Sequence, residues 1–132
     1  MSLVVTPLYA GLIAVLMAVL STRVGLLRGR YGVALGDGGQ PELALAIRRF
    51  GNLSEYAAMA VVVLGLMELT GWSSGWLHAY GLALVAFRLI HVVVLFDDMG
   101  APGWKKAGRG VAAAGTAALL ALGGVALVIS AL

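Results

Sequence analysis

Four apolar stretches, each long enough to cross a bilayer, constrain this chain more than any other feature of its sequence. They cover about residues 5–27, 41–70, 76–99 and 105–132. A helix of about 20 apolar residues spans the roughly 30 Å hydrocarbon layer of a membrane. The composition agrees, since 61% of the 132 residues are hydrophobic and 11% are charged. We therefore expect an all-α protein, a transmembrane four-helix bundle that forms a single integral membrane domain over residues 1–132 in a lipid membrane.

Charge predicts how the bundle is oriented. The nine Lys and Arg residues cluster near the first and third connections, whereas the N-terminus, the 71–75 turn and the C-terminus have none. The positive-inside rule then places the basic end in the cytoplasm and both termini outside. The net charge of +3 is explained by this topology, and no basic patch is interleaved with aromatic residues, so nucleic acid is not an expected partner. The first stretch has no positive n-region or small-residue cleavage site, and we expect it to be a retained span.

The second stretch, residues 41–70, carries polar side chains within a continuous helical pattern. At about 100° per residue, Arg48, Asn52 and Glu55 lie within about 60° of one another, and Arg49 and Tyr56 form a second stripe beside them. Arg48 and Glu55 lie about 10 Å apart along the axis at ~1.5 Å per residue. A cation, an amide and an anion at this spacing suit a small zwitterionic ligand. The alternative is that they contact headgroups, or that Arg48 pairs with Glu55 or Asn52.

The third stretch contains Arg88 and His91 among apolar residues. A charge near the middle of a span costs ~2.5–3.5 kcal/mol on insertion scales, so it normally faces the bundle interior with a partner. Glu55 is the candidate partner of Arg88, in an intramembrane ion pair that is compatible with ligand binding. Because polar groups of the second and third stretches gather at one depth, they favour a cavity open to the cytoplasm. His91 alone is more typical of packing than of ligation, and no role is expected for His78.

Other residues have simpler interpretations. Glu68, Trp72 and Trp76 are typical of the membrane interface, and Arg23 faces either headgroups or a polar pocket. Two histidines without an acidic neighbour make a poor metal site, so none is expected. The chain has no cysteine, and any thiol chemistry must use a thiol brought by a substrate. The small residues of the fourth stretch allow close helix contact.

Two motifs together resemble a known family. LGDGGQPELALAIRRFGNLSEY contains GDGG, a spacer, then A-I-R, N and E-Y, and the third stretch adds FRLIH, an Arg followed three residues later by His. This pattern resembles the bacterial branch of the MAPEG family, the membrane-associated proteins of eicosanoid and glutathione metabolism. The resemblance covers most of the chain. It implies a homotrimer of four-helix protomers in the bacterial inner membrane, with glutathione bound as co-substrate between neighbouring protomers near the cytoplasmic face.

The resemblance also implies roles for individual residues. Arg48 would hold a glutathione carboxylate, Asn52 would bond the peptide backbone, and Glu55 would take the γ-glutamyl ammonium. The same site would be lined by Tyr56, Arg88 and His91, with Arg28 or Arg23 approaching from the first span.

The sequence departs from the family pattern at two positions. Enzymes of the family place an Arg near the start of the fourth span to stabilise the thiolate, and the aligned residue here is Trp104. Lys105 or Arg109, or the neighbouring Lys106, would take that catalytic role after a small shift. A second family Tyr, one turn past His91, is replaced by Leu95.

The resemblance favours a glutathione transferase or peroxidase that acts on hydrophobic electrophiles arriving from the bilayer. A free thiol has a pKa of about 8.5, and a nearby cation lowers that pKa. A non-catalytic glutathione-binding membrane protein is the first alternative, favoured by the Trp104 departure. A small four-span drug/proton antiporter is the second, but such proteins usually need an acidic residue deep in the first span, and this span has none.

Overall fold

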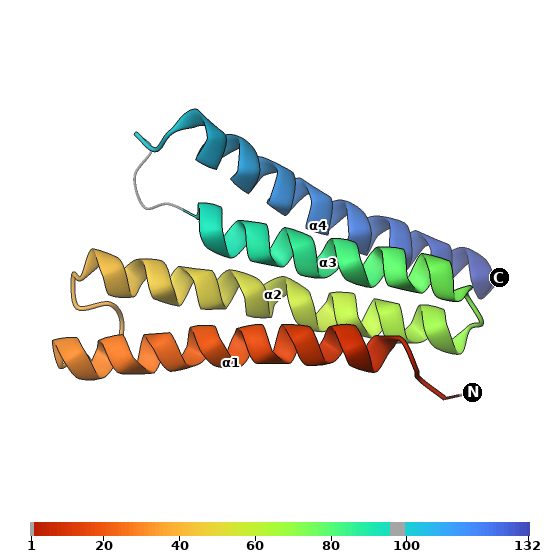
Figure 1. Cartoon of the computed structure of the whole chain (residues 1–132), viewed down its shortest axis with the longest axis horizontal. Helices are drawn as coiled ribbons and strands as arrows, with labels where there is room; N and C mark the ends of the chain where they lie inside the picture. The colour runs from red at the N-terminus through yellow and green to blue at the C-terminus, as the bar shows by residue number, and fades with distance from the viewer. Residues whose placement is uncertain (1, 96–99) are drawn as a thin grey trace.

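The computed structural model describes residues 2–95 and 100–132, and the helices in these ranges form a four-helix membrane bundle (Figure 1). They are α1 (Thr6–Tyr31), α2 (Pro41–Leu69), α3 (Ser74–Val94) and α4 (Gly103–Ser130). Each is long and apolar enough to cross a membrane. The expected all-α class is confirmed. The predicted end of the third span, at about residue 99, lies outside the described residues.

Proline and glycine determine where several helices begin and end. Pro7 lies in the first turn of α1 and Pro41 begins α2, positions where the missing N–H of proline has no helical partner to lose. α1 continues to Tyr31, past the end of its apolar stretch, and stops at Gly32. This glycine has φ of 66°, a left-handed conformation that costs glycine little, and its N–H bonds the carbonyl of Arg28.

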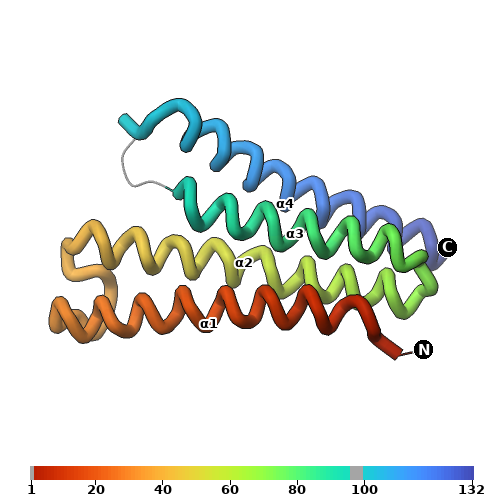
Figure 2. Tube along the Cα trace, in the orientation of Figure 1, coloured from red at the N-terminus to blue at the C-terminus, as the bar shows by residue number. Residues whose placement is uncertain are grey.

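The helices pack as two hairpins, α1–α2 and α3–α4, which meet through the central helices α2 and α3 (Figures 1 and 2). α1 contacts α2 and α3, and α4 contacts α3 and α2. Both termini lie at one end of the bundle, and the basic residues lie toward the other, which we call the basic end. α4 lies close to α3 near the C-terminus and diverges from it toward the basic end (Figure 1).

Close helix contact depends on small residues, as expected. A Cβ added at Gly81 of α3 would overlap the ring of Tyr9 on α1, and one added at Gly115 of α4 would overlap the ring of Phe87 on α3. Each glycine thus leaves room for an aromatic ring on the neighbouring helix. Apolar clusters, with Leu64 completely buried in one of them, fill the space between the helices.

Two polar residues near the termini have partners that the sequence did not indicate. Glu68, expected only at the interface, accepts hydrogen bonds from the backbone N–H groups of Val4, Val5 and Thr6 at 2.6–2.7 Å. The N–H of Thr6 is a donor that the first turn of a helix leaves without a helical partner, and those of Val4 and Val5 directly precede it. Similarly, Nδ1 of His78 lies 2.8 Å from the hydroxyl of Tyr9, so His78 joins α3 to α1.

Candidate functional site

The first part of the site is an ion pair on the surface of α2. Nη1 of Arg48 lies 3.2 Å from Oε1 of Glu55, and the two side chains are 59% and 53% exposed. They line a hollow of about 390 Å³ together with Gly36 and Asp37 of the connection between α1 and α2. One of the two predicted alternatives, direct pairing of Arg48 with Glu55, is therefore what the structure shows. A charged pair that is half exposed on a membrane helix is open to an outside partner.

The second part of the site is Arg88, which is only 2% exposed. Its Nη1 donates to Oδ1 of Asn52 at 2.8 Å, and its Nη2 donates to Oγ1 of Thr116 at 2.6 Å and to the carbonyl of Ala112 at 3.2 Å. The prediction that Arg88 forms an ion pair with Glu55 is therefore wrong. The carboxylate of Glu55 lies on the exposed side of α2 with Arg48, whereas Arg88 extends inward between α2 and α4.

The second stripe of α2 packs toward α3. The Arg88 guanidinium lies over the Tyr56 ring, 5.6 Å from its centroid, in a cation–π arrangement. Nη2 of Arg49 donates to the carbonyl of Leu95 at 3.2 Å, where α3 has just ended and its last carbonyls lack helical donors. His91, one turn beyond Arg88, is buried. Tyr56 and His91 therefore lie beside Arg88.

The basic residues of α1 hold the first connection in place. Nη1 of Arg28 donates to the carbonyls of Val33 and Ala34, at 3.4 and 3.0 Å. Arg23 pairs with Glu42 of α2 at 3.4 Å. Arg23 was predicted to face headgroups or a polar pocket, and it instead has a protein partner. Arg28 borders the connection whose residues help to form the hollow beside Arg48.

Lys105 and Arg109 lie in the first two turns of α4, at the basic end. The Lys105 ammonium lies over the ring of Trp104, 5.6 Å from its centroid, and Trp104 is 62% exposed. Both cations are therefore on the helix that diverges from α3 toward this end (Figure 1).

Sequence reasoning missed Thr116, which is completely buried and joins Arg88 to α4. Its hydroxyl also donates to the carbonyl of Ala112, one turn earlier, at 2.9 Å. The available signal was a hydroxyl within a run of Ala and Gly in the fourth stretch, which by itself fits close helix packing equally well.

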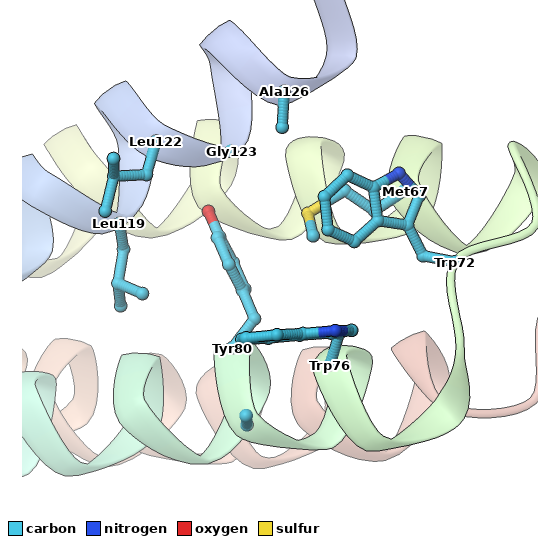
Figure 3. Close-up of a pocket in the computed structure, with 9 residues that line it drawn as sticks. Met67, Trp72, Trp76, Tyr80, Leu119, Leu122, Gly123 and Ala126 are labelled. Carbon is cyan, nitrogen blue, oxygen red and sulfur yellow. The ribbon is translucent and has the colours of Figure 1, made fainter. Parts of the chain in front are cut away.

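An apolar groove of about 260 Å³, whose lining residues are drawn in Figure 3, lies at the opposite end of the bundle, near the termini. Trp72 and Trp76, predicted to belong to an interfacial belt, line it with Met67 and Tyr80, and α4 closes one side at Gly123. This groove is separate from the ionic site because its residues come from the ends of the helices that are remote from Arg48.

Four apolar helices with a half-exposed ion pair and a buried cation toward one end define a four-span integral membrane protein with a polar site. The chain belongs to the MAPEG family, whose model matches residues 6–128. Relatives include the inner membrane protein YecN of Escherichia coli strain K12 and that of strain O6:H1. Each is 45% identical over 87 residues, which is 66% of either chain, just under two thirds of the relative's length. No solved structure matches the chain.

Proposed function

We propose that this protein is a glutathione-dependent transferase or peroxidase of the MAPEG family, which acts on hydrophobic electrophiles from the bilayer. The observation that carries the proposal is the placement of Arg48 and Glu55 beside an open hollow, with Asn52 between them on the same helix. Glutathione offers carboxylates, a peptide backbone and an ammonium group. These groups match the Arg48 cation, the Asn52 amide and the Glu55 anion, in that order.

The Arg48–Glu55 pair is compatible with such a ligand although its members already contact each other. Half-exposed ion pairs contribute only about 0–1 kcal/mol, so a ligand that brings both a carboxylate and an ammonium replaces one weak pair with two. Charge-assisted hydrogen bonds to the ligand are roughly twice as strong as neutral ones. We therefore expect the pair to open when glutathione binds.

A homotrimer would complete this site. Arg48 and Glu55 are half exposed on a membrane helix, and charged groups within a membrane normally face protein or a water-filled cavity. A neighbouring protomer packed against this face of α2 would shield them from lipid and close the hollow around the ligand. The basic residues favour a cytoplasmic location for this end, and the name of the YecN relatives favours the inner membrane.

The chemistry requires a thiolate. Lys105 or Arg109, placed near the bound thiol, would lower its pKa and favour the anion. The sulfur then forms a bond to the electrophilic carbon, the leaving group departs with its electron pair, and the thiol proton passes to solvent. Because glutathione and electrophile are held together, an encounter in solution becomes a local reaction.

Conjugation of glutathione to a chloronitrobenzene by the purified protein tests this proposal. We expect Arg48→Ala to lower activity strongly and Arg30→Ala to leave it near the wild-type value. Arg30 is a matched control because it lies on α1 at the basic end and its side chain is 70% exposed. Equal activity of Arg48→Ala and wild type would contradict the assignment of the site.

A non-catalytic glutathione-binding protein is the second candidate, and Trp104 is the observation that favours it. This exposed indole stands where the enzymes of the family would have a thiolate-stabilising Arg. Ultraviolet difference spectroscopy separates the two functions, because a thiolate absorbs where a thiol does not. Glutathione binding without a thiolate signal would favour the non-catalytic function.

A further inference from the structure

A chain of directed hydrogen bonds runs from α4 to α2 through the buried guanidinium of Arg88. A guanidinium has only donors, so both Thr116 and Asn52 must accept from it. The hydroxyl of Thr116 then directs its own proton to the carbonyl of Ala112. The direction of each bond in the chain is thus fixed by chemistry.

The consequence is the orientation of the Asn52 side chain. An amide can present either its oxygen or its NH2 group, and the choice depends on its hydrogen-bond partners. Arg88 takes the oxygen at 2.8 Å, which leaves the two N–H donors of Asn52 for another partner. Asn52 lies on α2 between Arg48 and Glu55 and, at about 100° per residue, shares a face of the helix with the ion pair.

We propose that Thr116 and Arg88 are positioning residues that fix the Asn52 amide as a hydrogen-bond donor, so that the site selects a ligand with an acceptor oxygen between its two charged ends. A peptide carbonyl in a zwitterionic peptide is such an acceptor. The proposal rests on the proposed function and specifies the ligand chemistry of that site.

Burial explains why the positioning residues act through Asn52. Arg88 is 2% exposed and Thr116 is completely buried, so neither offers a surface to a ligand. Water does not compete for their hydrogen bonds, and the Tyr56 ring lies against the guanidinium. Asn52 is only partly buried, which makes it the outermost residue in this series of hydrogen bonds.

Three substitutions, at two positions, separate positioning from general structural support. Thr116→Val keeps the shape of the side chain but cannot accept from Arg88, whereas Thr116→Ser retains the hydroxyl. Asn52→Asp keeps, and strengthens, the bond to Arg88 but has no N–H donor to offer. A structural role alone would leave glutathione binding by Asn52→Asp intact.

The experiment measures glutathione binding calorimetrically in detergent micelles, with thermal unfolding followed by circular dichroism on the same samples. We expect Thr116→Val to raise the Kd about tenfold, the usual effect of losing one hydrogen bond of about 1.4 kcal/mol, and Thr116→Ser to stay near wild type. Asn52→Asp should raise the Kd at least as much without lowering the unfolding temperature. Thr22→Val, an exposed position on α1, is the matched control.

The outcomes distinguish this inference from the proposed function. If wild-type protein binds no glutathione, the proposed function is wrong and the inference is overturned with it. If wild type binds and both Thr116→Val and Asn52→Asp bind equally well, the inference is wrong and the proposed function stands. If Thr116→Val does not fold, Asn52→Asp decides alone, since its bond to Arg88 is retained.

Discussion

The carboxylate of Glu68, at the end of α2, accepts the backbone N–H of Thr6 at 2.7 Å, where α1 begins. The N–H groups of Val4 and Val5 bond the same carboxylate. No Ser, Thr, Asp or Asn side chain of α1 caps that helix, whose N-cap residue is Val5. One helix therefore supplies the N-terminal cap of its neighbour, and the negative charge complements the positive end of the α1 dipole.

Loss of this cap should loosen the start of α1. We expect Glu68→Ala to lower the unfolding temperature in detergent, measured by circular dichroism, because three backbone donors lose their acceptor. Glu68→Gln keeps one acceptor oxygen and should fall between Ala and wild type. The same unfolding temperature for Glu68→Ala and wild type would mean that lipid or water satisfies these donors as well as the carboxylate does.

Gly81 should tolerate no larger side chain. A methyl group at this position meets the ring of Tyr9, so Gly81→Ala forces α1 and α3 apart and should destabilise the bundle by about 1–3 kcal/mol, a typical cost of overpacking. Gly11→Ala is the control, because a Cβ there has nothing within 4 Å and alanine favours the helix by about 0.5–1 kcal/mol. Unfolding by sodium dodecyl sulfate measures the stability of both variants. Equal stability of the two variants would contradict the close contact.

Reversal of the Arg48–Glu55 pair should separate stability from ligand binding. The double variant Arg48→Glu/Glu55→Arg retains an ion pair and should unfold within about 1 kcal/mol of wild type, because exposed pairs contribute no more than that. It presents each end of a zwitterion with a like charge, so glutathione binding should be lost. Binding by the double variant at wild-type affinity would show that the two charges do not orient the ligand.

Trp104→Arg should increase thiolate chemistry. The substitution restores the cation that the family enzymes are expected to carry at this position, and a nearby guanidinium lowers the pKa of a thiol. We expect a larger kcat for conjugation of a chloronitrobenzene and a stronger thiolate absorbance with bound glutathione. Trp104→Leu serves as the control for loss of the indole. No gain in Trp104→Arg over Trp104→Leu would place the thiol elsewhere.

Much of the fold follows from local features of the sequence. Hydropathy predicts four membrane helices, and Pro41 and Gly32 lie where α2 begins and α1 ends. Helical periodicity places Arg48 and Glu55 near each other, and the structure pairs them at 3.2 Å. Such features are predictable because an isolated helix already determines which of its own residues share a face.

The partners of Arg88 and Glu68 were less predictable. Arg88 was expected to take the carboxylate of Glu55 and instead takes neutral oxygens of Asn52 and Thr116. Glu68 was expected at the interface. It instead caps α1, where it accepts the N–H of Val5, 63 residues earlier in the chain. Opposite charge predicted that Arg88 pairs with Glu55. The Glu55 carboxylate, however, lies on the exposed side of α2, whereas Arg88 extends inward between α2 and α4.

Four membrane spans with the cations toward one end can be predicted from the sequence alone, because apolar length and charge position are properties of single segments. The contact of Arg88 with Thr116 instead of Glu55 could be seen only once the helices were packed together. That choice depends on how α2, α3 and α4 are rotated about their axes, and the rotation is set by contacts such as Phe87 against Gly115 that join residues distant in the chain.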